Sequence, residues 1–512
     1  MSVRYGFAID QTTCIGCHAC TVACKTEHEV PVGQFRTWVK YVDQGTFPNS
    51  TRDFGVMRCN HCTDAPCVTI CPTQALFQRD DGIVDFDRDR CIGCKSCMQG
   101  CPYDAIYIDE DTHTAAKCNF CAHRIDNDLE PACVVVCPTH SIWVGDLDDP
   151  GSGIAKLVNS RPTQVRSPEQ NTGPNVFYLG AERAVLDPLA APSSSGYLYS
   201  RPDPHRSEVS RDLAMDPVTK ARTTLNTAHP RPWGWRVTTY LWAKGVGGGA
   251  VLLAALALLA GIDLGVLTTI VAPALGVLGT AATGVLLIVD LKRPDRFWYI
   301  LTKSNFRSWL VLGSYALAAF AAVSGLWLLY GIAVETGLLD SSPAVWTVLA
   351  VLGIPTGIMV AGYTAFLFGQ AEGRDLWQSP LLFWHLVVQA LMVGSGALAI
   401  AALLAGTESA ALITRTLVVA TVVHVAMLVL EYCGRHATKA AAVAAHLVTH
   451  GRYARQFWAA GVALALLGAV LALPSWGGGL LALAALGGLA VQVALLTYES
   501  VFVRAGQDLP LS

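Results

Sequence analysis

The hydrophobic and polar positions divide this 512-residue chain near residue 240. Beyond that point, long apolar segments alternate with short polar loops, and each segment has the roughly 20 residues needed to cross a hydrocarbon core of about 30 Å. The pattern therefore predicts an all-α integral membrane domain of eight transmembrane helices. These helices are expected near residues 240–260, 266–290, 308–331, 345–368, 381–404, 412–431, 457–475 and 478–498.

Upstream of these segments the pattern changes. From about residue 148 to 235 the chain is rich in Pro, Ser, Gly, Asn and Arg without a sustained hydrophobic period, which is typical of a linker. The apolar run Val176–Leu179 resembles a strand and is expected to pack on the N-terminal region. We therefore expect an N-terminal domain over residues 1–190, a linker over 191–236 and a membrane domain over 237–512.

The composition agrees with a membrane protein. Hydrophobic residues make up 52% of the chain and charged residues 15%, whereas ordinary soluble domains contain about 25% charged residues. The 36 Lys and Arg residues are balanced by 39 Asp and Glu residues, which gives a formal net charge of -3. Nucleic acid is therefore not an expected partner.

The loops predict an orientation in the membrane. The first ten residues contain neither an apolar signal core nor a twin arginine, so the N-terminal domain is not expected to be exported on its own account. Loops on its side of the spans carry ten Lys and Arg residues, whereas loops on the opposite side carry only Arg415. Because basic loops remain in the cytoplasm, we expect a multi-pass protein of the inner (cytoplasmic) membrane, with the N-terminal domain on the cytoplasmic side.

Sixteen of the seventeen cysteines form four groups of four, and each group ends in a C-x3-C pair. The third group, CIGCKSCMQGCP, has the C-x2-C-x2-C-x3-C-P spacing of bacterial ferredoxins, in which three thiolates bind one cluster and the fourth reaches a neighbouring cluster. The spacing therefore predicts iron-sulfur clusters. The groups are Cys14, Cys17, Cys20, Cys24; Cys59, Cys62, Cys67, Cys71; Cys91, Cys94, Cys97, Cys101; and Cys118, Cys121, Cys133, Cys137.

Zinc sites and disulfides are alternative uses of these cysteines, but neither requires the x3-C-P ending. The segment CIGCH, ending at His18, also matches the attachment pattern of c-type haem. Since Cys20 and Cys24 complete a ferredoxin group around it, we expect His18 to be a bystander. The N-terminal region is thus expected to be an α+β domain of two bacterial-ferredoxin-like units, although the spacing leaves open which groups pair.

On these motifs, residues 1 to about 190 resemble the four-cluster electron-transfer subunits of molybdopterin oxidoreductases, which serve dimethyl sulfoxide, polysulfide and nitrate reductases in anaerobic respiration. The resemblance implies that the first group pairs with the fourth and the second with the third. It also implies four 4Fe-4S clusters, because this chain keeps all sixteen cysteines. The implied ligand sets are Cys14/Cys17/Cys20/Cys137, Cys24/Cys118/Cys121/Cys133, Cys59/Cys62/Cys67/Cys101 and Cys71/Cys91/Cys94/Cys97. In that family a partner with an export signal can also carry the cluster subunit across the membrane.

The segment from about 235 to 512 resembles the NrfD-like membrane subunits of polysulfide reductase. The matching text is WGWRVTTYLWAKGVGGGA at the first span, DLKRPDRFWYILTKSNFRSW after the second, GYTAFLFG in the fourth, SPLLFW at the fifth and AGQDLP near the C-terminus. This resemblance implies eight spans and electron exchange with a quinone, either menaquinone or ubiquinone, without haem.

Ionisable residues within the spans are candidates for a quinone site, because burying them in a bilayer is costly. Lys244, Asp290 and Tyr363 lie at a similar depth near the ferredoxin side, and Lys244 and Tyr363 are expected to touch the quinone head. The alternative roles are snorkelling for Lys244, an aromatic belt for Tyr363 and an ion-pair loop with Lys292 and Arg293 for Asp290.

His385 and Gln389, one helical turn apart in the fifth span, are further quinone candidates. His385 and His424 could instead bind a b-type haem, but hydrogen bonding between helices is the commoner use of such residues, so no haem is expected. Cys433 is expected to be structural. Because the ionisable residues, including Glu431, lie toward the ferredoxin side, quinone protons are expected to exchange there.

Together these features predict an electron-transfer and membrane-anchor subunit without substrate chemistry of its own. It would pass electrons through four clusters between a separate catalytic subunit and the membrane quinone pool. A molybdopterin-containing subunit and the lipid bilayer are the expected partners. The alternatives are a multihaem cytochrome partner, or a passive membrane tether for a ferredoxin domain that serves a soluble acceptor.

Overall fold

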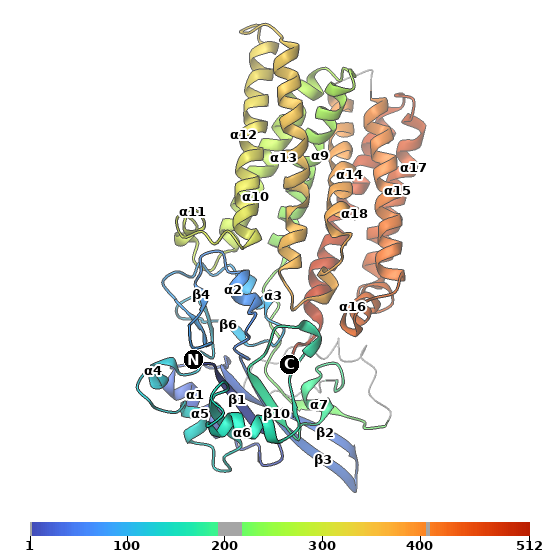
Figure 1. The fold of residues 1–512 in the computed structure, drawn as a ribbon. Coiled ribbons are helices and arrows are strands. Elements are labelled where there is room, and N and C mark those ends of the chain that lie inside the picture. Colours follow the sequence, from blue (N-terminus) through green and yellow to red (C-terminus); the bar gives the residue numbers. More distant parts are fainter. Residues whose placement is uncertain (1–2, 193–217, 406–409) are drawn as a thin grey trace.

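The computed structural model describes residues 3–192, 218–405 and 410–512, and it places an α+β domain against one end of a helical bundle (Figure 1). Within the described residues, eight helical segments are long and apolar enough to cross a membrane, which confirms the predicted number of spans. The segments are α9 (Trp235–Leu259), α10 with the short turn before it (Leu267–Asp290), α12 (Trp309–Glu335), α13 (Pro343–Gly369), α14 (Leu382–Ala405), α15 (Ala411–Cys433), α17 with its flanking turns (Gln456–Ser475) and α18 (Leu481–Asp508).

The last span is longer than its apolar pattern predicted. Helix α18 continues to Asp508, about ten residues past the expected end near 498. The added turns contain buried residues such as Val501, Phe502 and Val503, so they pack against protein rather than lipid. The end of the hydrophobic pattern therefore marks the membrane surface and not the end of the helix.

Helix α9 lies in the middle of the bundle and packs against α10, α13 and α14. Its GVGGGA segment explains how the backbones come so close. A Cβ atom at Gly249 would collide with the backbone carbonyl of Ala390 in α14, and one at Gly247 would lie 2.9 Å from the carbonyl of Leu275 in α10. Small residues at crossings replace the hydrophobic driving force that is missing between helices in lipid.

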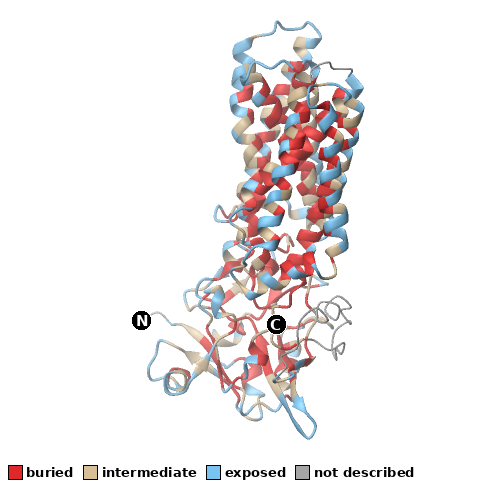
Figure 2. Cartoon of the chain, turned by 90° about the vertical axis from the view of Figure 1, so that its right-hand side faces the viewer, coloured by how far each residue is buried: buried red, intermediate tan, exposed pale blue. Residues whose placement is uncertain are grey.

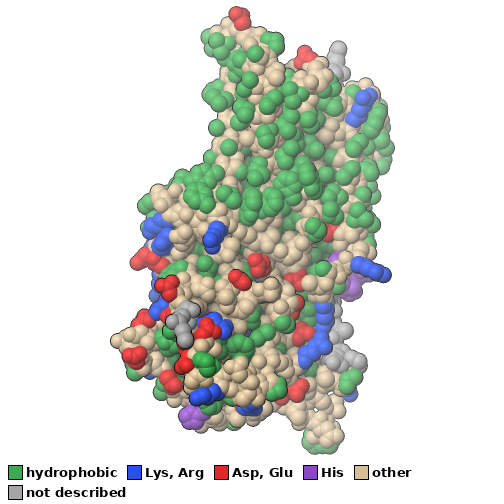
Figure 3. All heavy atoms as spheres, in the orientation of Figure 1, with side chains coloured by type: hydrophobic (Ala, Val, Ile, Leu, Met, Phe, Trp, Pro, Cys, Tyr) green, Lys and Arg blue, Asp and Glu red, His purple; other side chains and the backbone are tan. Residues whose placement is uncertain are grey.

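The outer surface of the bundle is apolar. Hydrophobic side chains cover it in Figure 3, whereas most Lys, Arg, Asp and Glu side chains lie on the domain below. Buried residues concentrate on the helix faces turned toward one another (Figure 2). Leu329, Leu404 and Leu430, for example, are each more than 60% exposed on the outside. Exposed apolar area of this extent suits contact with lipid.

The N-terminal domain contains a four-stranded sheet in the order β8-β1-β10-β9 and a three-stranded sheet in the order β11-β2-β3. The apolar run 176–179 forms β10, which pairs with β1 in parallel and is almost fully buried. Two hairpins, β4-β5 and β6-β7, lie nearer the membrane (Figure 1). The strands are β1 (Tyr5–Asp10), β2 (Thr37–Thr46), β3 (Asn49–Arg58), β4 (Leu76–Gln78), β5 (Val84–Phe86), β6 (Ile106–Ile108), β7 (Ala115–Lys117), β8 (Ile142–Asp146), β9 (Thr163–Gln164), β10 (Val176–Leu179) and β11 (Arg222–Leu225).

Short helices connect these strands. They are α1 (Ala19–Glu27), α2 (Pro66–Thr69), α3 (Ser96–Gly100), α4 (Ala122–Ile125), α5 (Ala132–Val135), α6 (Gly153–Ser160) and α7 (Arg183–Leu186). Of the predicted linker, residues 193–217 lie outside the described residues. The part that follows is not a free connection, because β11 pairs with β2 and the next residues lead directly into α9.

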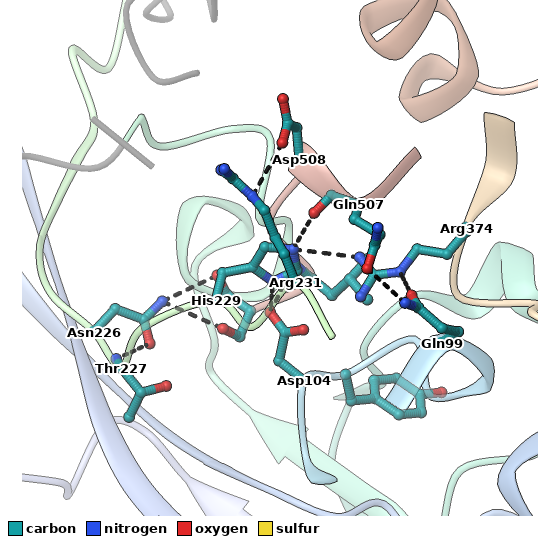
Figure 4. A network of polar contacts seen from close by, with 12 residues as sticks. Gln99, Asp104, Asn226, Thr227, His229, Arg231, Arg374, Gln507 and Asp508 are labelled. Carbon is teal, nitrogen blue, oxygen red and sulfur yellow. Dashed lines mark hydrogen bonds and ion pairs between the residues drawn. The ribbon is translucent and has the colours of Figure 1, made fainter. Parts of the chain in front are cut away.

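The two domains are joined by a buried polar network (Figure 4). Arg374, between α13 and α14, donates to Gln99 Oε1 at 2.7 Å, and Gln99 donates to Gln507 Oε1 of α18, also at 2.7 Å. His229, in the segment before α9, lies 2.7 Å from Asp104 of the N-terminal domain. Because unpaired buried polar groups are costly, this network specifies one docked arrangement of the domains.

Candidate functional site

The four cysteine groups share one backbone feature. In the first C-x2-C segment of each group, the residue before the second cysteine has a positive φ, at Gly16, His61, Gly93 and Phe120. This left-handed conformation turns the loop tightly, and only two of the four positions use glycine, which adopts it without strain. The repeated geometry shows that the four groups fold alike, as expected for related ferredoxin-type loops.

The loops bring together thiols from the first and fourth groups and from the second and third. Cys14 interacts electrostatically with Cys137, and Cys24 with Cys118. Cys67 interacts with Cys101. We number the four resulting thiol sets as set 1 (Cys14, Cys17, Cys20, Cys137), set 2 (Cys24, Cys118, Cys121, Cys133), set 3 (Cys59, Cys62, Cys67, Cys101) and set 4 (Cys71, Cys91, Cys94, Cys97).

The sets also follow one another in space. Cys20 of set 1 interacts with Cys133 of set 2. Cys118 of set 2 interacts with Cys59 of set 3, and Cys97 of set 4 interacts with Cys67 of set 3. The thiol sets therefore form a continuous series from 1 to 4.

The thiol environment fits iron-sulfur clusters better than single metal ions. Across the described residues, which include all sixteen cysteines of the four groups, no three His, Cys, Asp or Glu side chains converge tightly enough to hold one ion. A zinc site requires sulfur ligands at about 2.3 Å from a single ion, whereas the ligands of a multi-iron cluster stand further apart. Burial raises the pKa of Cys62 to about 12 and that of Cys101 to about 11, so these thiols ionise near neutral pH only where a bound cation stabilises the thiolate.

Several N–H groups point at the sulfurs. Backbone amides of Gly93 and Ala115 donate to Cys91 Sγ at 3.4 and 3.3 Å, and the amide of Ser141 donates to Cys137 Sγ at 3.3 Å. Such hydrogen bonds stabilise anionic sulfur and are typical around clusters. His18 Nε2 lies 2.8 Å from the Tyr41 hydroxyl, and its role as a bystander stays a prediction.

A cavity of about 100 Å³ lies between set 4 and the first helices of the bundle. It reaches from Cys94 to Tyr363 and is mainly apolar, with a few polar groups, as ligand sites usually are. Tyr363 and Asp290, both predicted from the sequence, line it. Its other lining residues include Ser96, Trp233, Tyr240, Phe297, Leu310 and Ser314.

Lys244 does not line this cavity. Its Nζ donates to the backbone carbonyls of Val360 at 3.0 Å and Ala361 at 2.5 Å, and it lies 4.9 Å from the centroid of the Tyr363 ring. An electrostatic interaction also links it to Glu499 of α18. Lys244 therefore contacts the back of the cavity wall and can position Tyr363 rather than reach into the cavity. It is fully buried, so it does not snorkel.

Asp290 forms an ion pair that the sequence did not suggest. Its carboxylate lies 2.7 Å from Lys95 in the third cysteine group and 3.6 Å from Arg236 in α9. The loop residue Arg293 instead pairs with Asp295 at 2.8 Å. Asp290 thus joins the cluster domain to the membrane domain beside the cavity.

His385 and Gln389 lie away from the cavity lining, in the second half of the bundle. His385 Nε2 lies 2.9 Å from His424 Nδ1, and His385 Nδ1 lies 3.2 Å from Glu431 Oε2. This contact between α14 and α15 is the interhelical hydrogen bond that the sequence favours for the pair. Gln389 is buried one helical turn from His385.

Two cavity residues, Tyr240 and Trp233, were not found from the sequence. Tyr240 lies one helical turn before Lys244 in the WGWRVTTYLWAK segment, so helical periodicity could have placed it on the same side of α9. Trp233 precedes the helix and stacks on Trp377 at 5.5 Å. Only the folded path of the linker brings it to the cavity.

A domain with four thiol sets, docked on eight apolar helices, defines a class of membrane-bound iron-sulfur electron-transfer proteins. Comparisons with known proteins agree. Residues 51–147 match the family described as 4Fe-4S dicluster domain, and residues 223–506, more than half of the chain, match the family described as Polysulphide reductase, NrfD. The chain belongs to this polysulphide reductase NrfD family.

The N-terminal domain also has curated relatives. It is 46% identical over 190 residues to the B subunit of tetrathionate reductase from Salmonella typhimurium (strain LT2), a match that covers 36% of this chain and 76% of that protein. The B polypeptide of polysulfide reductase from Wolinella succinogenes is 39% identical over 190 residues, 36% of this chain and all of that protein. The putative dimethyl sulfoxide reductase iron-sulfur B subunit of Halobacterium salinarum is 38% identical over 212 residues, 35% of this chain and 80% of that protein. The chain is therefore an iron-sulfur electron-transfer and membrane-anchor subunit, and it joins a membrane domain to the part that these relatives match.

Proposed function

We propose that this subunit carries electrons through four 4Fe-4S clusters between a separate catalytic subunit and a quinone bound at the membrane face. The observation that carries the proposal is the cavity that touches both Cys94 of set 4 and Tyr363 of the membrane domain. Such a cavity would hold a redox ligand directly beside the last cluster, so no further carrier would be needed.

Each thiol set is proposed to hold one 4Fe-4S cluster, with set 1 and set 4 at the two ends of the series. A cluster supplies one-electron transfer when bound. The protein contributes buried thiolates, the N–H groups that stabilise them, and loops that keep neighbouring sets in contact. The contacts between Cys20 and Cys133, Cys118 and Cys59, and Cys97 and Cys67 support the order 1-2-3-4.

Set 1 is the proposed contact with the catalytic subunit. Cys17 is exposed, whereas most other cysteines of the four groups are buried. Ile15 and Val22 near it, and Val135 and Trp143 on the adjacent α5 and β8, are 42–60% exposed, which gives this end an apolar surface. Helices α1 and α5 lie at the end of the domain far from the bundle (Figure 1). A partner can therefore dock there without meeting the membrane.

The cavity at set 4 is the proposed site of the quinone head. The Tyr363 hydroxyl can donate a hydrogen bond to a quinone oxygen, and the Asp290 carboxylate can accept one from a quinol hydroxyl. The surrounding apolar side chains, such as Leu310 and Leu367, exclude water. Oxidation of a quinol would release two electrons and two protons, and set 4 would hold the cluster that takes the electrons one at a time. The quinone is proposed to be menaquinone or ubiquinone.

The proposed partner is a molybdopterin-containing oxidoreductase. The relatives named above belong by name to tetrathionate, polysulfide and dimethyl sulfoxide reductases, in each case as one lettered component of the reductase, which supports a separate catalytic chain. A multihaem cytochrome is the alternative partner. The basic loops beside the cluster domain support a location in the inner membrane with that domain in the cytoplasm.

Anaerobically purified chain, reconstituted with a short-chain quinol, tests this function without any partner. We expect the quinol to bleach the visible absorbance of the clusters, and a competitive quinone-site inhibitor to block the bleaching. A passive tether would leave the clusters oxidised under the same conditions, while dithionite would still reduce them. That result would overturn the proposed quinone reaction.

A further inference from the structure

Arg58 is a buried cation placed between two thiol sets. It is the last residue of β3, directly before Cys59, and it is 0% exposed. Its Nη1 donates to Cys133 Sγ at 3.3 Å, and its guanidinium lies 4.4 Å from the centroid of the Phe7 ring. The aromatic ring and the buried strand hold the charge against the sulfur.

The charge of Arg58 has no carboxylate partner in the part of the chain that the structure describes. No Asp or Glu there lies within ion-pair distance of its guanidinium, and its Nε and Nη2 are buried without hydrogen-bond partners. Its electrostatic interactions are with Cys133 and Cys118 of set 2 and with Cys20 of set 1. A permanently charged guanidinium at such a position must be balanced by the negative charge on these sulfurs.

Set 2 differs from the other sets in the kind of donors it receives. Besides Arg58, His28 Nε2 lies 3.1 Å from Cys121 Sγ. The buried Lys117, which donates to the carbonyl of Cys118, interacts with Cys118 and with Cys67 of set 3.

The other sets also lie near cations, but carboxylates face these cations. Arg296 interacts with Cys91 of set 4 and lies 3.9 Å from Asp89 and Asp295, and Arg374 interacts with Cys101 of set 3 and with Asp104. The described N–H donors to Cys91 of set 4 and to Cys137 of set 1 are backbone amides. The nearby Lys95 is neutralised by Asp290. Among the described residues, set 2 is thus distinguished by a sulfur that accepts a hydrogen bond from a buried cation without a carboxylate partner.

We propose that Arg58 raises the midpoint reduction potential of the cluster at set 2 above those of the other three clusters. Reduction adds one electron to the cluster and neither makes nor breaks a bond, so the reduced form carries one more negative charge. A cation in a low-dielectric interior stabilises that form preferentially. The first electron to enter the series from either end therefore rests at set 2, one step away from the catalytic subunit.

The proposal rests on the four-cluster assignment, and the experiment separates the two. The full chain is purified anaerobically, its iron is counted, and the four potentials are measured by redox titration with electron paramagnetic resonance. In Arg58→Met we expect one transition, the highest, to fall by at least the 59 mV that corresponds to a tenfold change in a one-electron equilibrium. In Arg58→Lys, which keeps the charge, the same potential should fall by less than half as much.

Lys40→Met serves as a matched control. Lys40 is another buried cation of the same sheet, and its Nζ donates to the carbonyl of Val185. We expect all four potentials to remain in place. Four unchanged potentials in a fully loaded Arg58→Met protein would overturn the proposal, as would an equal shift in the Lys40 variant. An iron count well below sixteen in the unmodified chain would instead count against the four-cluster assignment.

If Arg58→Met fails to assemble, a second variant can still test whether set 2 holds the cluster of highest potential. Cys133→Ser alters or removes only the cluster at set 2. We expect the highest-potential transition of the unmodified chain to shift or disappear in this variant. If that transition survives and another one changes, set 2 is not the highest-potential site and the proposal is wrong.

Discussion

Lys95 and Asp290 form an ion pair of 2.7 Å between the third cysteine group and the end of the second span. Lys95 directly follows Cys94, and Asp290 lines the cavity that Cys94 also touches. The same pair that docks the two domains therefore aligns the last cluster site with the proposed quinone. Side-chain exposures of 7% and 15% make it a largely buried pair.

We expect Lys95→Met to weaken the docking of the two domains. Removing one partner of a buried ion pair costs about 3–5 kcal/mol because a buried charge is left behind. Because Arg236 lies 3.6 Å from Asp290 and still compensates part of its charge, the cost should lie near the lower end of this range. The measurement is the urea midpoint for loss of cluster absorbance in detergent.

Arg183→Met is the matched control, because Arg183 forms an exposed ion pair with Asp187 within the N-terminal domain. Exposed pairs contribute about 0–1 kcal/mol, so this midpoint should hardly change. Equal midpoints in the two variants would show that the Lys95 pair does not hold the domains together.

Tyr363→Phe should slow quinol-driven reduction of the clusters while leaving dithionite reduction intact. Loss of one buried hydrogen-bond donor costs about 1–3 kcal/mol, which corresponds to roughly 5- to 150-fold in quinone affinity. Tyr330→Phe is the control, because Tyr330 hydrogen-bonds the carbonyl of Asp340 at the far end of the bundle. Normal quinol kinetics in the Tyr363 variant would show that the Tyr363 hydroxyl does not bind the quinone.

Lys244→Met should act through Tyr363. Because Lys244 Nζ bonds the Val360 and Ala361 carbonyls and lies over the Tyr363 ring, its loss should displace that ring rather than remove a ligand contact. The double variant with Tyr363→Phe should therefore be only slightly slower than the slower single variant. Independent, additive effects on the apparent quinol affinity would indicate that Lys244 contacts the quinone itself.

Quantitative analysis should find sixteen irons and sixteen acid-labile sulfides per chain. Cys433→Ser should leave both counts unchanged, because Cys433 is exposed at the end of α15 and belongs to none of the four groups. Cys101→Ser, in set 3, should lower the iron count. A reproducible value near twelve irons, or stoichiometric zinc, would contradict four 4Fe-4S clusters.

The sequence predicted those features that depend on local spacing. Cysteine loops and apolar spans depend on residues close in the chain, so the positions of the thiol groups and the eight helices could be read directly. The contacts of Lys244 could not be predicted in this way, because the depth of a residue in a helix does not determine which neighbouring helix its side chain faces. The docking network around Arg374 and His229 also escaped prediction, because its members come from four separate segments of the chain.

Protons released at the quinone should leave on the side of the cluster domain. Glu431, His385 and His424 form a hydrogen-bonded chain between α14 and α15. This chain lies toward the ends of the two helices that face the cluster domain (Figure 1). The halves of the eight spans that lie beyond His424, away from that domain, contain no Asp, Glu, Lys or His in their sequence except Glu335 at the rim. A relay across a membrane usually requires such groups, so turnover should be electrically neutral.

The complete complex in liposomes with a voltage-sensitive dye provides the test, and a potassium diffusion potential calibrates the dye. We expect no quinol-dependent signal during steady turnover. A sustained membrane potential without another pump would show that protons cross the far half of the bundle through ordered water, and the ferredoxin-side route would then be wrong.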